Sequence, residues 1–174
     1  MACTVVSNGR SLACKTGVGG IKNIFFAPYS AVTAALSDSS GTITLTDSET
    51  FYKYEVKGNS SLETSIVSSR ENGTTYYETT LNATFPVLDV ATQEQIKLLA
   101  HGRPQIVVED YNGNVFLIGK EHGAEVTGGT IVTGAAMGDL SGFTLVLTAQ
   151  ETAPPFFCAS APTDDSTSAI DPNA

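Results

Sequence analysis

Residues 61–87 read SLETSIVSSRENGTTYYETTLNATFPV, and they carry the clearest structural signal in the chain. Asn72-Gly73 lies between two segments, Ser61–Arg70 and Thr74–Val87, that are rich in the β-branched and aromatic residues typical of strands. Asn-Gly favours the tight turn of a β-hairpin, because that turn needs positive φ angles that these residues tolerate. The stretch therefore predicts a long antiparallel hairpin.

The second arm of this hairpin has two different faces. One face becomes apolar toward the base of the hairpin: Thr75, Tyr77, Thr79, Leu81, Ala83, Phe85 and Val87. The other face is largely polar and consists of Tyr76, Glu78, Thr80, Asn82 and Thr84. Near the turn, the hairpin is polar on both faces. At about 3.3 Å per residue, each arm spans roughly 30–45 Å, which is longer than one small domain needs. We expect the hairpin to reach onto a neighbouring subunit.

Strand patterns continue on both sides of the hairpin. We expect strands at residues 21–26, 41–46, 50–56, 105–109, 115–119, 125–134 and 142–150. Residues 31–36 fit either a short strand or a turn of helix. Asn112-Gly113 predicts a second hairpin. Its two strands are apolar on both faces, so they should lie in the centre of a covered sheet.

One helix is expected, over residues 89–100. Asp89 is an N-cap candidate, and His101-Gly102 is a suitable stop at the other end. The side chains expected to face a sheet are Val90, Ile96, Leu99 and Ala100. Together the elements predict a mostly β fold, a sandwich or barrel with one flanking α-helix and a long β-hairpin.

The chain divides into three parts. Residues 1–19 are small, polar and Gly-rich, and we expect an irregular N-terminal arm. Residues 20–152 hold the strand patterns and form the β domain. Pro154-Pro155 should end the ordered part, because residues 159–174 are too poor in apolar groups to fold. We therefore expect residues 153–174 to be a disordered or extended tail.

The composition is acidic but weakly charged. The 174 residues include 18 Asp+Glu against 9 Lys+Arg, a net charge of −9, which argues against binding to a phosphate backbone. An acidic wall would instead let DNA slide past without sticking. Charged residues make up only 16%, against about 25% in a typical soluble protein, which suggests that much of the surface contacts other subunits.

The cysteines and the N-terminus indicate a protein made in a reducing cytosol. Cys3, Cys14 and Cys158 are odd in number and widely spaced, so we expect three reduced thiols rather than a disulfide framework. We see no signal peptide and no apolar stretch of the length that a membrane helix needs.

No pattern of residues predicts chemistry. His101 and His122 lack the spacing of a metal pair, and the Gly-rich residues 127–142 lack the Gly-Lys-Ser/Thr of a phosphate loop. Glu109-Asp110 and Glu121 gather near the second hairpin and suggest paired carboxylates. Adjacent strand residues point to opposite faces, however, so a solvated hairpin end is the better interpretation. We expect no catalytic, cofactor or metal site, and no enzyme.

Three stretches resemble virion proteins of tailed bacteriophages with Bacteroidetes-type hosts, namely their tail tube proteins. They are GGIKNIFFA at residues 19–27, IVVEDYNGNVFLIG at residues 106–119, and EVTGGT with GAAMGDLSGFTLVLT at residues 125–130 and 134–148. The resemblance covers roughly residues 19–150. The order of elements fits as well, since tail tube subunits are small β-sandwiches or barrels with one helix on the flank.

The resemblance implies a structural role in the virion tail, assembled in the cytoplasm of the bacterial host. Subunits would self-associate into hexameric rings, whose strands join a continuous inner barrel, and would contact other tail and neck proteins. Rings would stack through loops, hairpins and terminal arms, with Ser61–Val87 as candidate lumen wall or ring contact and residues 1–19 as candidate arm. DNA would pass through the lumen without specific binding. Candidate lumen acids are Glu55, Glu63, Glu71 and Glu78.

Two other functions stay open. A neck, collar or tail-completion ring would use the same fold and would differ in having few copies per virion. A β-sandwich surface binding module would be a monomer in solution.

Overall fold

The structure is a computed structural model that describes residues 8–11, 14–29, 35–37, 42–45, 50–56, 58–166 and 170–171. These residues form a mostly β fold, which confirms the predicted class. The elements are β1 (Ile21–Ala27), β2 (Ala35–Ser37), β3 (Thr42–Thr44), β4 (Tyr52–Glu55), β5 (Ser61–Ser69), β6 (Thr74–Pro86), α1 (Val90–His101), β7 (Gln105–Asp110), β8 (Val115–Ile118), β9 (Glu125–Val132), β10 (Gly142–Glu151) and β11 (Phe156–Cys158).

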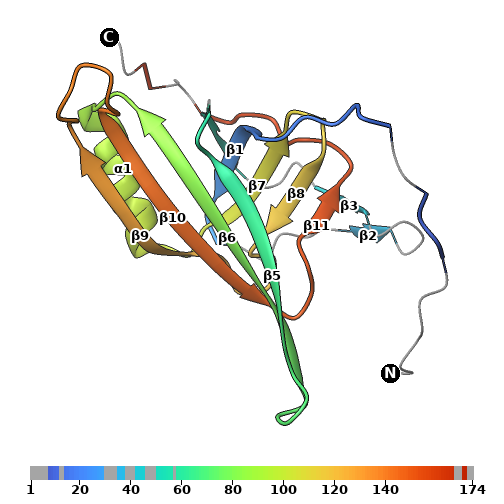
Figure 1. The fold of residues 1–174 in the computed structure, drawn as a ribbon. Helices are drawn as coiled ribbons and strands as arrows, with labels where there is room; N and C mark the ends of the chain where they lie inside the picture. The colour runs from blue at the N-terminus through green and yellow to red at the C-terminus, as the bar shows by residue number, and fades with distance from the viewer. Residues whose placement is uncertain are drawn as a thin grey trace.

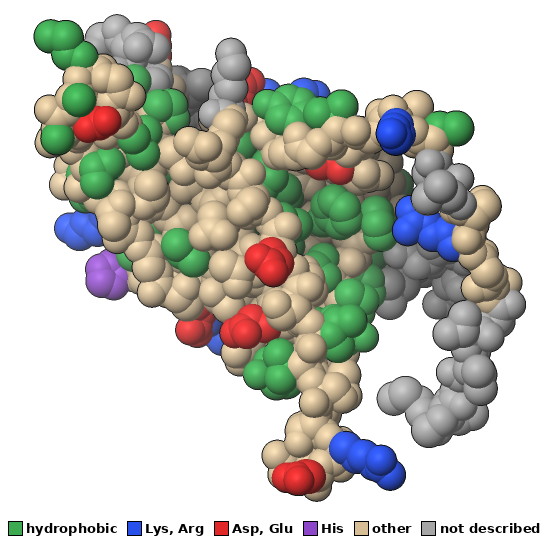
Figure 2. All heavy atoms as spheres, in the orientation of Figure 1, with side chains coloured by type: hydrophobic (Ala, Val, Ile, Leu, Met, Phe, Trp, Pro, Cys, Tyr) green, Lys and Arg blue, Asp and Glu red, His purple; other side chains and the backbone are tan. Residues whose placement is uncertain are grey.

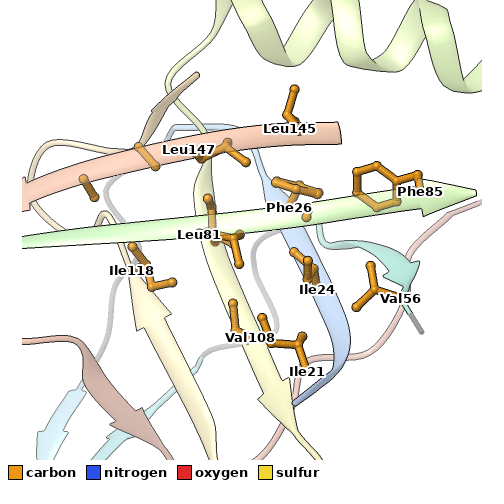
Figure 3. Close-up of a cluster of buried hydrophobic side chains, with 14 of the residues drawn as sticks. Ile21, Ile24, Phe26, Val56, Leu81, Phe85, Val108, Ile118, Leu145 and Leu147 are labelled. Carbon is orange, nitrogen blue, oxygen red and sulfur yellow. The ribbon is translucent and has the colours of Figure 1, made fainter. Parts of the chain in front are cut away.

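The strands form two sheets that pack face to face (Figure 1). The larger sheet has the order β2-β3-β11-β8-β7-β1-β4, and the four-stranded sheet has the order β5-β6-β10-β9. Strands of one sheet cross those of the other (Figure 3). Neither sheet closes on itself, so the described elements form an open two-layer structure.

A cluster of buried apolar side chains fills the space between the sheets (Figure 3). Ile24, Phe26 and Val108 come from the larger sheet, and Leu81 and Leu147 come from the four-stranded sheet. Each of them is at most 2% exposed. Full burial of such a side chain stabilises the fold by about 1.5–3 kcal/mol. The alternation in β6 and β10 therefore arises because every second residue faces this cluster.

A second apolar cluster lies on the opposite face of the larger sheet. Phe25 and Val107 alternate with residues of the central cluster, so they point the other way. Leu117 of β8 and Ile43 of β3 join them, and both are fully buried. β7 and β8 are therefore covered on both faces and lie inside the sheet, which confirms the prediction made from their apolar character.

The expectation that order ends at Pro154-Pro155 is wrong. Proline lacks the N–H that a continuing strand needs, but it does not prevent a new strand from starting. β11 follows the two prolines and pairs antiparallel with β8 and parallel with β3. Phe156 and Ala161 pack against the second cluster, so this part of the tail completes the cover over the larger sheet.

The segment after β11 also covers the β4 edge of the larger sheet. The backbone N–H of Phe51 donates to Asp165 Oδ2 at 3.1 Å, and that of Lys53 donates to Asp164 Oδ1 at 3.3 Å. The N–H of Asp165 in turn donates to the carbonyl of Phe51 at 2.9 Å. The chain thus occupies its own edge, which is one way in which proteins block unwanted strand pairing.

The helix begins and ends where the sequence predicts. Asp89 caps it by accepting a hydrogen bond from the N–H of Thr92 at 2.8 Å, and Gly102 follows its last residue. Ile96 and Leu99 pack against the central cluster, as expected. Val90 is 74% exposed and Ala100 is exposed, so their expected contacts with a sheet are wrong. Both lie on parts of the helix surface that turn away from the sandwich.

Two expectations fall largely outside the described residues. The element expected at residues 31–36 is described only from Ala35, where β2 begins. Residues 1–7 of the expected N-terminal arm are outside the description. The described parts of that arm, residues 8–11 and 14–19, are exposed and belong to no helix or strand.

Ending the chain at Thr152 tests the role of the C-terminal segment. The truncation removes β11 and uncovers the second cluster, so we expect the free energy of unfolding to fall by more than about 3 kcal/mol. Urea unfolding measures the change. The milder double substitution Asp164→Asn with Asp165→Asn should cost about 1–3 kcal/mol, since it weakens only the bonds to β4. An unchanged urea midpoint in the truncated chain would show that the segment does not cover the sheet.

Candidate assembly surface

Both edges of the four-stranded sheet are open. β5 and β9 are its outermost strands, and no described strand pairs with their outer sides. Their sequences, SLETSIVSS and EVTGGTIV, contain no Lys, Arg or Pro, which commonly protect an edge. Each contains one Glu, and the pairing of β9 with β10 has an irregularity between Val126 and Gly128. The larger sheet differs, because its β4 edge is covered by the C-terminal segment and its β2 edge is only three residues long.

The two open edges run in opposite directions. Each neighbouring pair in the four-stranded sheet, β5–β6, β6–β10 and β10–β9, is antiparallel. Four alternating strands leave β5 antiparallel to β9. A second copy placed beside the first by a rotation would therefore set its β9 against β5 in antiparallel orientation, which continues the alternation without a break.

The outer face of the four-stranded sheet, which points away from the larger sheet, is rich in hydroxyl groups. It includes Ser61, Glu63, Ser65, Glu78, Thr80, Asn82, Thr84, Glu125, Thr127, Thr130, Thr144, Val146, Thr148 and Gln150. Threonines bond across the strands, with Thr130 Oγ1 at 2.6 Å from Thr144 Oγ1. In Figure 2 this face is mostly tan, with a few acidic side chains in red. Its charged side chains are all glutamates.

The structure separates the four predicted lumen acids. Glu63 and Glu78 lie on the outer face, and Glu78 accepts a hydrogen bond from Gln150 Nε2 at 3.0 Å. Glu71 lies in the turn of the first hairpin. Glu55 belongs to β4 of the other sheet, where it pairs with Lys53 at 2.7 Å. The outer face contains a further acid that sequence reasoning missed, Glu125, which stands opposite Thr148.

The predicted hairpin is confirmed as β5 and β6, paired from Ser61–Asn82 to Ser69–Thr74. Its far end projects beyond the rest of the four-stranded sheet (Figure 1). Gly73 has a φ of 63°, as its turn requires.

The projecting part carries apolar groups on both faces. Ile66 stands opposite Tyr77 on one face, and Val67 stands opposite Tyr76 on the other. Ile66 is 69% exposed and Val67 is 36% exposed. From the sequence we expected apolar residues only near the base of the hairpin, because Ile66 and Val67 are flanked by serines. Exposed aliphatic side chains on a projecting hairpin are typical of a surface that contacts a partner.

The carboxylates near the second hairpin do not face one another as a pair. Glu109 bonds to Lys22 Nζ at 2.9 Å and to Asn23 Nδ2 at 2.6 Å. Desolvation by burial opposes ionisation of Glu109, but the bonds from Asn23 and Lys22 outweigh it and lower its pKa. Glu121 instead accepts a hydrogen bond from Thr152 Oγ1 at 3.2 Å. Each carboxylate has its own structural partners, so the three do not act as a pair, but Glu109 and Asp110 are half-buried rather than solvated as expected.

Asp110 organises the turn of the second hairpin. Its carboxylate accepts hydrogen bonds from the N–H groups of Asn112 at 2.8 Å and Asn114 at 2.7 Å, and from Asn114 Nδ2 at 2.7 Å. Burial opposes ionisation, but these bonds outweigh it, so the pKa of Asp110 lies below its ordinary 3.8. The residue therefore has a structural role in the turn.

Other reactive groups are scattered. His101 and His122 are both exposed, and within the described ranges no three His, Cys, Asp or Glu side chains gather as metal ligands. Cys14 is exposed and free, whereas burial raises the pKa of the free Cys158 thiol to about 11. Cys3 lies outside the described residues.

None of the described helices has the length and apolar character needed to cross a membrane.

Replacing Asp110 with Ala tests its role in the turn. We expect a loss of about 1–3 kcal/mol at pH 7, because two backbone N–H groups lose a charged acceptor. A folded-state pKa below 3.8 means that this stabilisation is present above that value and is lost as the pH falls through the folded pKa. The difference between the two proteins should therefore shrink below about pH 4.

Urea unfolding across pH measures this difference. Glu71→Ala in the first turn is the control and should change stability by less than about 0.5 kcal/mol. An Asp110→Ala protein as stable as the unaltered chain at pH 7 would contradict the structural role.

Comparisons of the chain with protein-family models, with curated proteins and with solved structures find no match.

Proposed function

We propose that this chain is a structural subunit of a phage tail tube, in which copies form stacked rings around a lumen that conducts DNA. The observation that carries the proposal is the pair of open, antiparallel edges of the four-stranded sheet. A strand edge without a partner tends to pair with another strand. Here both edges belong to one sheet and run in opposite directions. The β5 edge of each copy can therefore pair antiparallel with the β9 edge of the next, and the same contact repeats between all copies.

Repeated pairing of β5 with β9 of the next copy builds a ring. Each subunit adds four strands to a continuous sheet, and closure of the ring removes every free edge. The larger sheet and α1 lie on one side of this wall, because both pack on the inner face of the four-stranded sheet. The outer face lines the lumen. A hexamer is the number that the resemblance to tail tube proteins implies.

The chemistry of the outer face suits passage of DNA. Its charges, Glu63, Glu78 and Glu125, repel phosphates, and it offers no Lys or Arg to hold them. Hydroxyl groups that already bond to one another, such as Thr130 with Thr144, have less capacity to bind a base or phosphate. DNA would slide along this wall without specific contacts.

The projecting hairpin suits contact between rings. It extends beyond the wall along the strand direction (Figure 1), and Ile66 and Val67 are exposed in the single subunit, each opposite a half-buried tyrosine. A contact between different surfaces at the two ends of a ring repeats without closing, and so it produces a filament. The N-terminal arm is a second candidate for this contact.

Electron microscopy of the purified chain tests the proposal. We expect hollow filaments or six-fold rings in negative stain at high protein concentration. A monomer that stays monomeric at high concentration would contradict the proposed function.

Shortening the hairpin separates ring formation from stacking. Ser65 and Glu78 stand opposite each other, so Asn-Gly can replace residues 66–77, which removes Ile66 and Val67 with their partner tyrosines and keeps the register. This variant should form rings that do not stack. The control keeps the length and changes only Arg70→Ser and Glu71→Ser, and it should still form filaments. Unchanged filaments from the shortened chain would show that the hairpin has no part in stacking.

A further inference from the structure

The gap between the two sheets is closed at one side of the sandwich and open at the other. Under β9, α1 closes the gap between the sheets through Ile96 and Leu99. Under β5, the gap remains open as a cavity of about 470 Å³. Apolar side chains make up much of its lining: Val18, Ile21, Leu62, Val108, Phe116 and Pro155.

The outward surface of α1 also exposes apolar side chains. No residue of the helix is fully buried. Val90, Glu94 and Leu98 are spaced four residues apart and form one stripe, the α1 stripe. Val90 is 74% exposed and Leu98 is 64% exposed. Lys97 and His101 lie beside the last residue of the stripe and are also exposed.

We infer that the cavity under β5 receives the α1 stripe, led by Leu98, of the neighbouring copy in a ring. The inference rests on the proposed pairing of β5 with β9. α1 contacts β9 and packs on the inner side of the four-stranded sheet, and the cavity lies on that same side under β5. Joining the two edges therefore brings the helix of one copy to the cavity of the other.

Charge favours entry of the Leu98 end of the α1 stripe over its Glu94 end. Asp110 is the one charged residue among those that line the cavity, and Asn112 lies near it. The half of α1 that contains Leu98 carries Lys97 and His101 and no acid after Glu94. A cationic helix end beside an acidic cavity is favourable, and Leu98 would gain burial against Leu62, Val108 and Phe116. The helix would then close both its own sandwich and that of its neighbour.

Cross-linking tests the contact directly. Leu98→Cys and Leu62→Cys are introduced separately into a chain carrying Cys3→Ser, Cys14→Ser and Cys158→Ala. The two variants are mixed as subunits and assembled together, and a short bismaleimide is then added. We expect covalent dimers that contain one copy of each variant. The control replaces Leu62→Cys with Met137→Cys, which is fully exposed in the loop between β9 and β10, far from the β5 edge, and it should give no dimers with Leu98→Cys.

A second cross-link distinguishes the two levels of the proposal. Glu63→Cys on β5 and Glu125→Cys on β9, which both align with the Thr80–Thr148 pair in the centre of the sheet, report the edge pairing alone. Cross-linking of the edges without any between Leu98→Cys and Leu62→Cys would overturn the helix contact and leave the ring intact. Absence of both, with no assembly, would overturn the ring and the helix contact together.

Substitution at Leu98 gives an independent measurement. Leu98→Glu places an acid against a cavity that contains Asp110, so we expect the concentration needed for assembly to rise about tenfold or more. Leu98→Met keeps the apolar contact and should assemble normally. Because Leu98 is exposed in the subunit, both variants should keep the urea midpoint of the unassembled chain. Normal assembly of Leu98→Glu would overturn the inference.

Discussion

β10 pairs along its full length with β6, from Gly142 opposite Pro86 to Glu151 opposite Tyr77, and the other elements depend on this ladder. It sets the alternation that directs Leu81 and Leu147 into the core. Its start requires glycine, since a Cβ at Gly142 would overlap the carbonyl oxygen of Phe85. With these two strands in the centre, β5 and β9 necessarily become the edges of the four-stranded sheet.

The two sheets differ in how far their faces and edges are covered within the single chain. The larger sheet is covered on one face by the sandwich core and on the other by the second cluster and the C-terminal segment. The four-stranded sheet is covered on one face only, and neither of its edges has a partner among the described strands. In a subunit of this kind, the contacts with other copies are expected on the sheet whose outer face and edges are uncovered, which here is the four-stranded sheet. This contrast supports a structural subunit more strongly than the acidic composition does.

Local signals in the sequence predicted the elements that depend on neighbours along the chain. Asn72-Gly73 and Asn112-Gly113 located both hairpins, and Asp89 located the start of the helix, because turn and cap chemistry act over a few residues. β11 was missed because three residues in a polar tail become a strand only through pairing with β8 and β3, which lie far away in sequence.

The outer-face glutamates were identified only in part for a similar reason. Glu63 and Glu78 belong to the hairpin, whose pairing is local. Glu125 joins them, and Glu55 does not, because the order of strands in the two sheets decides which acids share a face. The open cavity under β5 likewise depends on how distant strands cross, which no local pattern reports.

Amide hydrogen exchange on the assembled and unassembled protein tests the pairing of open edges most directly. Edge pairing predicts that amides of both β5 and β9 become strongly protected on assembly, while those of β7, already inside a sheet, change little. Assembled particles in which β5 and β9 exchange as fast as in the free subunit would contradict a ring built by joining these strands.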